Sequence, residues 1–187
     1  MIYDKNTLRQ QIKQQRKALT HEEIACKSEK ITAFITASDI YKNADCVCVY
    51  MAAFNEPRTI PFIHTALADG KRVCIPLSDT DSCTLTLSYI SSTDDLTAGA
   101  YGILEPVRID VASPGDIDLI LVPGIVFDEN GSRIGFGKGF YDRLLADTRA
   151  KKAGICYDFQ VCSGIAADAH DIPMDVLITE NGITVCN

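Results

Sequence analysis

The chain has 187 residues and the composition of an ordinary globular protein, with 47% hydrophobic and 23% charged residues. This length is typical of one domain with a substantial core, and we expect residues 1–187 to form a single domain. No apolar run approaches the roughly 20 residues of a membrane-spanning helix, and the N-terminus lacks a signal-peptide layout, so we expect a cytoplasmic protein. The net charge of −7 argues against nucleic acid and acidic membranes as partners, and an anionic ligand would need a local basic pocket.

The eight cysteines contain no C-x-x-C pair and no zinc-ligand spacing. Four of them lie in strand-like runs, where a thiol acts as a small apolar side chain: Cys46, Cys48, Cys74 and Cys156. We therefore expect buried free thiols rather than disulfides.

Two helices are expected at the start of the chain. Residues 4–18 have helical periodicity, with Asp4 suited to the N-cap. Thr20 and Glu23 form a capping box that opens a second helix, to about residue 36. Basic residues of the first helix recur at steps of four, four and three and share one face: Lys5, Arg9, Lys13 and Arg16. Taken alone, this face is more typical of a solvated surface than of a site.

A βαβ unit follows. Residues 45–52 are short, apolar and β-rich, as a buried parallel strand is, and a helix over about 58–68 and a strand over 71–76 come next. This order predicts a single-domain three-layer α/β/α fold with a mostly parallel central sheet. Ligands of such sheets lie beyond the C-terminal ends of the strands, where Glu56 stands. Its carboxylate could bind an amino-heterocycle or only begin a helix, and its position leaves both open.

The remaining elements are strands with short connections. A half-buried strand is expected over 84–90, a capped turn over 91–96, and further strands over 117–123, 151–156, 172–179 and 183–186. Asn181-Gly182 is a strong hairpin signal between the last two.

A glycine-rich stretch over 131–143 dominates the second half of the chain. It reads Gly-Ser-Arg-Ile-Gly-Phe-Gly-Lys-Gly-Phe-Tyr-Asp-Arg and runs into a short helical pattern over 140–145. Glycines let the backbone approach a ligand closely, and a helix start offers unpaired N–H groups to an anion. Arg133 and Lys138 add positive charge, so the stretch predicts a phosphate cradle.

This cradle matches neither of two familiar nucleotide loops. A Walker A loop fails because Ser132 stands where its first glycine belongs and Gly139 follows the lysine. A dinucleotide fingerprint fails because Phe140 stands at its third glycine.

Three acids are candidate magnesium ligands. Asp142 stands four residues after Lys138, so in one helix both side chains would face the same site. Magnesium prefers one or two carboxylates plus phosphate oxygens, although a simple Lys–Asp pair would explain the spacing equally. Asp171 and Asp175, which immediately precede the closing strand, are further candidates.

The residues from Arg133 to Arg143, with Pro123-Gly124 and Phe127-Asp128 upstream, resemble the signature of the 5-formyltetrahydrofolate cyclo-ligase family, also called methenyltetrahydrofolate synthetase. The resemblance extends to four other segments: Lys5-x-x-Leu-Arg9 with Arg16, Asn55-Glu56-Pro57, Tyr101-Gly102-Ile103 with Glu105-Pro106, and His170 to Thr179. It implies an ATP- and Mg²⁺-dependent ligase that converts 5-formyltetrahydrofolate to 5,10-methenyltetrahydrofolate and releases ADP and phosphate. Phosphorylation of the formyl oxygen would prepare the formyl carbon for attack by N10.

The resemblance also implies roles for individual residues. ATP would be bound by Lys5, Arg9, Arg133, Ile134, Gly135, Phe136, Gly137, Lys138, Gly139, Phe140 and Tyr141. Within that set, Lys138 and Arg133 would be the catalytic residues that stabilise the transferring group. Glu56 would bind the pterin, the folate pocket would also include Met51, Phe54 and Tyr141, and Asp142 and Asp171 would bind magnesium. Phe140 replaces the tyrosine of many members, which removes a hydroxyl but keeps a ring for stacking.

The expected partners are ATP and 5-formyltetrahydrofolate, whose polyglutamate tail, if present, would favour nearby basic residues; we expect a monomer. Two other interpretations stay open. The first is another α/β enzyme for a phosphorylated ligand, such as a sugar-phosphate isomerase or a CoA-dependent enzyme, and it predicts turnover without ATP. The second is a non-catalytic folate- or nucleotide-binding module, and it predicts binding without ADP formation.

Overall fold

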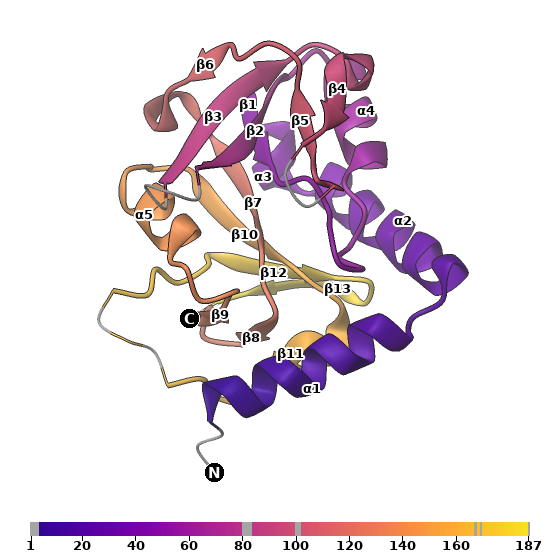
Figure 1. The fold of residues 1–187 in the computed structure, drawn as a ribbon, viewed down its shortest axis with the longest axis vertical. Coiled ribbons are helices and arrows are strands. Elements are labelled where there is room, and N and C mark those ends of the chain that lie inside the picture. The colour runs from indigo at the N-terminus through magenta and orange to yellow at the C-terminus, as the bar shows by residue number, and fades with distance from the viewer. Residues whose placement is uncertain (1–3, 80–83, 100–101, 167, 169, 187) are drawn as a thin grey trace.

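The computed structural model describes residues 4–79, 84–99, 102–166, 168 and 170–186. Its centre is a sheet of eight strands with helices on both sides (Figure 1). The strand order is β13-β12-β10-β7-β1-β2-β3-β6, and the five strands from β12 to β2 are all paired in parallel. The remaining strands β13, β3 and β6 pair antiparallel at the two edges. The expected three-layer α/β/α fold with a mostly parallel sheet is confirmed.

The strands of this sheet are β1 (Cys46–Val49), β2 (Arg72–Asp79), β3 (Thr84–Ile90), β6 (Val111–Ala112), β7 (Leu119–Pro123), β10 (Lys151–Ile155), β12 (Val176–Thr179) and β13 (Gly182–Val185). The helices are α1 (Lys5–Ala18), α2 (His21–Ala37), α3 (Asp39–Lys42), α4 (Ile60–Ala68) and α5 (Phe140–Ala146), with short 3₁₀ turns η1 (Thr93–Asp95), η3 (Pro114–Asp116) and η4 (Asp158–Gln160). A hairpin of β4 (Leu96–Ala98) and β5 (Leu104–Pro106) lies beside the sheet.

Alternation along β1 directs its side chains to the two faces of the sheet. Val47 and Val49 belong to the core under α2, α3 and α4, whereas Cys46 and Cys48 belong to the core under α5. The four cysteines expected inside strands are all buried, and the seven cysteines in the described part of the chain are free. The prediction of buried free thiols is confirmed for Cys46, Cys48, Cys74 and Cys156.

Local signals placed the first two helices correctly. The Asp4 carboxylate accepts a 3.0 Å hydrogen bond from the backbone N–H of Thr7, and the reciprocal Thr20–Glu23 capping box is formed. Helix α1 packs through Leu8 and Ile12 against Ile125, Val126 and Ile134 rather than against the main sheet. This docking brings the basic face of α1 beside the glycine-rich stretch.

Two parts of the chain differ from the expectations. Residues 126–134 form part of a second, three-stranded sheet of β11 (Val161–Cys162), β8 (Val126–Asp128) and β9 (Arg133–Ile134), which no pattern had indicated. The strand expected over 172–179 begins only at Val176, because the four residues before it form a loop. Among the motif residues, Tyr101 lies outside the described residues. No helix in the described ranges is both long and apolar enough to cross a membrane.

Candidate functional site

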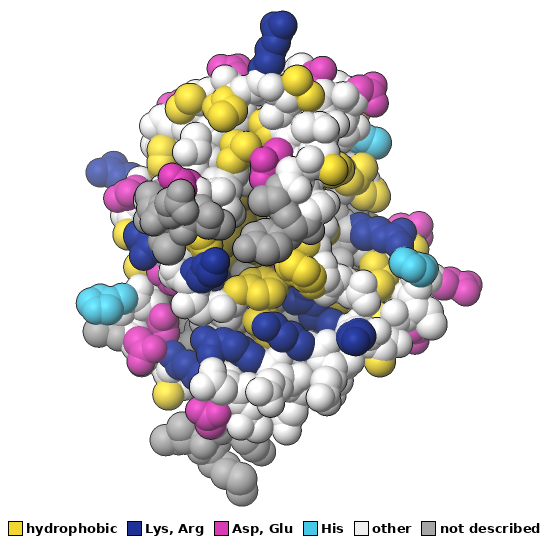
Figure 2. Space-filling model, viewed as in Figure 1, with side chains coloured by type: hydrophobic (Ala, Val, Ile, Leu, Met, Phe, Trp, Pro, Cys, Tyr) yellow, Lys and Arg dark blue, Asp and Glu magenta, His cyan; other side chains and the backbone are white. Residues whose placement is uncertain are grey.

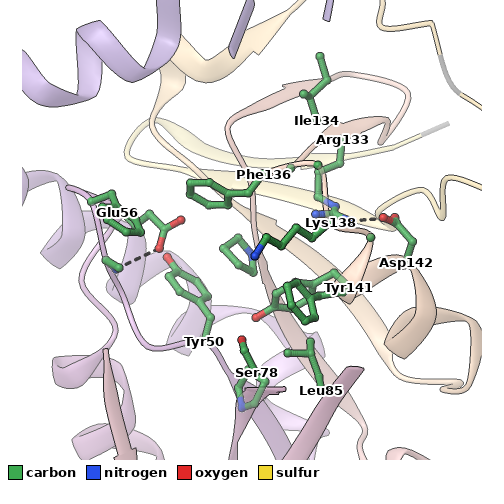
Figure 3. Close-up of a pocket in the computed structure, with 18 of the residues that line it drawn as sticks. Tyr50, Glu56, Ser78, Leu85, Arg133, Ile134, Phe136, Lys138, Tyr141 and Asp142 are labelled. Atoms are coloured by element: carbon green, nitrogen blue, oxygen red, sulfur yellow. Dashed lines mark hydrogen bonds and ion pairs between the residues drawn. The ribbon is translucent and has the colours of Figure 1, made fainter. Parts of the chain in front are cut away.

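A cavity of about 620 Å³ lies at the C-terminal ends of β1, β2 and β7. Parallel sheets bind ligands at the C-terminal ends of their strands, where the strand order reverses. Here the chain leaves β1 toward β2 on one side and leaves β7 toward β10 on the other. Every residue that the sequence nominated for the ATP, folate and magnesium sites lines this one cavity, with the exception of Asp175 (Figure 3). Three distant parts of the chain therefore meet: α1, the turn after β1 and the glycine-rich stretch.

Sequence reasoning missed other residues of the lining. They are mostly apolar or small, and only Pro123 belongs to a recognised motif: Tyr50, Ala53, Pro76, Ser78, Leu85, Pro123 and Asp168. Tyr50, Pro76 and Pro123 stand at or near the ends of parallel strands, and that position could have indicated them.

Left-handed glycines shape the loop before α5. Gly137 has φ 95° and Gly139 has φ 67°, a conformation that L residues rarely adopt. Gly139 is the N-cap of α5, so Lys138 lies outside the helix. Its side chain extends toward the part of the cavity where Tyr50 and Glu56 lie (Figure 3), and no described residue forms an ion pair with it.

Asp142 pairs with Arg133 rather than with Lys138. Nη2 of Arg133 donates to the Asp142 carboxylate at 2.8 Å. The expected helical spacing between Lys138 and Asp142 was wrong, because the left-handed turn at Gly139 separates Lys138 from the helix. The Arg133 side chain is 6% exposed, and its Nε is buried without a hydrogen-bond partner in the described structure.

Helix α1 contributes two cations to the cavity. The ammonium of Lys5 lies 2.7 Å from a carboxylate oxygen of Asp168 and 3.3 Å from one of Asp171, and its pKa is raised mainly by the hydrogen bond to Asp168. Nε of Arg9 donates to the carbonyl of Gly135 at 3.0 Å, which ties the helix to the glycine loop. A candidate ATP residue and a candidate magnesium ligand, Lys5 and Asp171, are thus direct neighbours.

Asp175 is the exception. Its carboxylate accepts a hydrogen bond from the backbone N–H of Lys152 at 2.7 Å, near the start of β10. That position is at the N-terminal ends of the parallel strands, whereas the cavity lies at their C-terminal ends. Asp175 is therefore not available to the site. Proximity in sequence to the closing strand was a misleading signal.

Glu56 is a nearly buried acid in the turn after β1, with 6% of the residue exposed. One carboxylate oxygen accepts a 3.1 Å hydrogen bond from the backbone N–H of Ala53. The other, Oε1, lies 3.6 Å from Nη2 of Arg16 and has no hydrogen-bond partner among the described groups. Burial raises the pKa of Glu56 to about 7, against the lowering effect of Arg16.

An aromatic pair forms the rim of the cavity. The rings of Phe54 and Phe136 are exposed and 5.9 Å apart, and the Lys13 ammonium lies 5.3 Å from the centre of the Phe136 ring. Beyond them a second hollow of about 500 Å³ is lined by Lys13, Arg16, Lys17, Phe54, Asn55 and Phe136. Figure 2 shows Lys and Arg side chains gathered in the lower half of this face, next to exposed hydrophobic side chains. This is the kind of local basic surface that an anionic ligand of an acidic protein requires.

The carboxylates of the cavity do not form a metal cage by themselves. Within the described ranges no group of three or more His, Cys, Asp or Glu residues could hold a metal ion. Asp142 and Asp171 line the same cavity, and this donor set suits a cation that takes its other ligands from phosphate and water.

Comparison with known proteins decides the family. The profile of the 5-formyltetrahydrofolate cyclo-ligase family matches residues 1–180. The chain belongs to this family. It is 28% identical to the mouse 5-formyltetrahydrofolate cyclo-ligase, over 95% of this chain and 94% of the mouse protein. The Escherichia coli K12 cyclo-ligase is 30% identical, over 92% and 98% of the two chains.

A solved structure supports the same relationship. The NMR structure of the 5,10-methenyltetrahydrofolate synthetase from Aquifex aeolicus superposes with a TM-score of 0.86 at 36% identity, covering 97% of this chain and 92% of that one. The resemblance inferred from the glycine-rich stretch is thereby confirmed, and the cyclo-ligase fold extends over nearly the whole chain.

Proposed function

We propose that this protein is a 5-formyltetrahydrofolate cyclo-ligase, which closes 5-formyltetrahydrofolate to 5,10-methenyltetrahydrofolate with ATP. The observation that carries the proposal is one cavity with two complementary ends. Lys5, Arg9, Arg133 and Lys138 provide positive charge at the glycine loop. On the other side Glu56 offers a buried carboxylate oxygen that accepts no hydrogen bond from the described groups. Phosphate groups suit the first end and a hydrogen-bond donor suits the second.

The reaction needs a better leaving group than the formyl oxygen. Transfer of the γ-phosphoryl group forms a bond from this oxygen to phosphorus and breaks the bond to ADP. N10 then attacks the formyl carbon and loses its proton to solvent, the carbon–oxygen bond breaks, and phosphate leaves. In this scheme Lys138, which has no ion-pair partner in the described structure, neutralises the charge on the transferring group, and Arg133 assists.

The remaining contacts of ATP come from the backbone and from α1. Residues 134–141 present the loop with its left-handed glycines, which allow close approach to the phosphates. Arg9 already fixes this loop through the Gly135 carbonyl. Lys5 lines the same cavity from α1 and would contact phosphate there.

Asp142 and Asp171 are the residues that would hold Mg²⁺. When bound, the ion would neutralise phosphate charge between ATP and the two carboxylates. Each acid is paired with a cation, Asp142 with Arg133 and Asp171 with Lys5. These pairs keep both carboxylates at the phosphate end of the cavity. Lys5 has a second and closer partner in Asp168, at 2.7 Å.

The folate would enter from the Phe54–Phe136 rim. Glu56 would accept paired hydrogen bonds from the pterin, and the aromatic and apolar walls of Met51, Phe54 and Tyr141 would contact its ring. We further propose that a polyglutamate tail would extend over the second hollow toward Lys13 and Lys17. The chain would work as one monomeric, cytoplasmic domain over residues 1–187, without nucleic acid or membrane partners.

The decisive experiment mixes the purified protein with Mg·ATP and 5-formyltetrahydrofolate and follows methenyl absorbance together with ADP. Coupled appearance of both products is expected. Turnover of a phosphorylated substrate without ATP would favour another α/β enzyme, and ligand binding without ADP would favour a non-catalytic module. Either result, in the absence of methenyl product, would contradict the proposed ligase.

A further inference from the structure

Arg16 is a buried cation in the last turn of α1, with 2% of the residue exposed. Its guanidinium donates to the carbonyl of Phe54 from Nη2 at 2.6 Å and from Nε at 3.2 Å, and to the carbonyl of Ala53 at 3.2 Å. Nη1 donates to the carbonyl of Gly124 at 3.4 Å. In return, the Arg16 carbonyl accepts a 3.0 Å hydrogen bond from the Asn55 amide. One side chain thus joins α1 to the segments after β1 and β7.

The turn that Arg16 holds has an unfavourable backbone. Phe54 and Asn55 are consecutive non-glycine residues with φ of 50° and 58°. A bulky residue in this left-handed region is strained and persists only where its surroundings fix it. The hydrogen bonds from Arg16 to this turn supply such a restraint, and the turn carries Glu56 at its end.

The arrangement around Glu56 leaves one oxygen open. Arg16 gives its hydrogen bonds to carbonyl groups, so Oε1 of Glu56 forms a 3.6 Å ion pair with Nη2 but accepts no hydrogen bond from the described groups. Charge attraction therefore favours the charged carboxylate, while Oε1 keeps its capacity to accept a hydrogen bond. The other charged or titratable groups on this side of the cavity are Tyr50, after β1, Tyr141, from α5, and Lys138, from the glycine-rich loop, whose side chain extends toward Glu56. Burial raises the pKa of both phenols, so they stay neutral.

We propose that Arg16 is the positioning residue of the pterin site: it fixes the Ala53–Glu56 turn and stabilises the charged form of the Glu56 carboxylate, without touching the pterin. The proposal rests on the proposed function, since it deepens the role of Glu56 in that reaction. It assigns to the first helix a second task beside its ATP contacts. In contrast to Lys5 and Arg9, Arg16 does not line the ATP and folate cavity.

The test compares Arg16→Met, which removes the charge at similar length, with Arg16→Lys, which keeps it. For Arg16→Met, KM for 5-formyltetrahydrofolate should rise about tenfold while KM for ATP changes little. The acidic limb of the pH profile, where kcat/KM for the folate falls as the pH is lowered, should shift to higher pH by about one unit. The reason is that Glu56 loses the positive charge of Arg16. For Arg16→Lys, the same KM should rise, but the limb should stay at the wild-type pH. Lys30→Met, an exposed cation on α2, is the matched control.

Further outcomes decide between a positioning role and a merely structural one. The proposal would be overturned if Arg16→Met lost stability while the ratio of the two KM values and the pH of the acidic limb stayed unchanged. If Arg16→Met lacks a cooperative thermal transition, the ratio of the two KM values in Arg16→Lys decides, and equal changes in both would overturn it.

A double substitution tests the link to Glu56 directly. Adding Arg16→Met to Glu56→Gln should not raise the folate KM further, because the carboxylate that Arg16 serves is already gone. Additive effects would contradict the inference. Wild-type protein is the reference throughout: failure of the wild type to form methenyl product contradicts the proposed function, whereas a normal wild type with an unchanged Arg16→Met contradicts the positioning role alone.

Discussion

Nη2 of Arg133 and the carboxylate of Asp142 are 2.8 Å apart, so an expected phosphate contact and an expected magnesium ligand are paired with each other. The pair joins β9 to α5 across the glycine-rich loop. A mutation of either residue therefore changes two functions, and a test of metal binding has to preserve the hydrogen bond to Arg133.

Asp142→Asn keeps an oxygen acceptor for Arg133 but removes the negative charge. If Asp142 binds magnesium, the Mg²⁺ concentration for half-maximal activity at fixed ATP should rise about tenfold or more. Asp147→Asn, an exposed acid at the end of the same helix, is the control. An unchanged Mg²⁺ titration for Asp142→Asn would remove this residue from the metal site.

Lys138→Ala should lower kcat by about 100- to 1,000-fold, because it removes a full charge from the transferring phosphoryl group. The side chain is exposed on its loop, so the midpoint of thermal unfolding should stay near that of the wild type. Steady-state kinetics and a thermal melt check both statements. A near-normal kcat would show that another cation carries this role.

Glu56 should make folding stability depend on pH. Its folded pKa of about 7 lies above the ordinary value of 4.5, so the native state holds a proton that the unfolded state has released. The free energy of unfolding then falls as pH rises from about 4.5 to about 7, by an amount on the order of 3 kcal/mol. Glu56→Gln removes the titrating carboxyl group, and with it this fall in the free energy of unfolding.

Urea unfolding at pH 5 and pH 8 measures the effect. The stability of Glu56→Gln relative to the wild type should increase by about 1 to 3 kcal/mol between the two pH values. Glu129→Gln, an exposed acid, should show no such increase. A pH-independent difference for Glu56→Gln would mean that the carboxylate is charged in both states.

Asp128 should be important for stability rather than for chemistry. The residue is 1% exposed, and its carboxylate accepts hydrogen bonds from the backbone N–H groups of Asn130, Ser132 and Ile165. Asp128→Ala leaves these donors unpaired and should lower the free energy of unfolding by about 3 kcal/mol, as measured in urea. Glu129→Ala, its exposed neighbour, should change it by less than about 0.5 kcal/mol.

Signals that act over a few residues allowed much of the fold to be predicted. The caps at Asp4 and Thr20 and the apolar strands β1 and β7 depend on neighbours in the sequence, and these elements were expected close to their observed bounds. The small sheet of β8, β9 and β11 was not, because each of its strands has only two or three residues and β11 pairs with β8 from over 30 positions away. Short strands that depend on distant partners have no periodicity to detect.

The candidate site, too, could be predicted from local signals only in part. The residues of the glycine-rich stretch were nominated from their composition and from the family signature, and they line one cavity. The sequence could not separate Arg16 from Lys13, since both lie on the same basic face of α1. The difference arises from tertiary structure, because, of these two side chains, it is Arg16 that donates hydrogen bonds to the carbonyls of Phe54 and Gly124. Likewise, the backbone conformation of Gly139, rather than residue spacing, decided the partner of Asp142.

Helix α1 supplies Lys5 and Arg9 to the cavity, yet the hydrogen-bonded ladder of the central sheet is complete without it. Its apolar attachment depends on two side chains, Leu8 and Ile12, which contact the segment around β8 and β9. Partial opening of a protein begins where few buried contacts hold an element. Arg16 anchors only the last turn of α1. We therefore expect amide hydrogen exchange in the part of α1 before Arg16 to be faster than in β1 and β7, and nucleotide affinity to disappear on heating before the sheet melts. Bound ATP, in contact with both α1 and the glycine-rich loop, would hold the helix in place and slow this exchange.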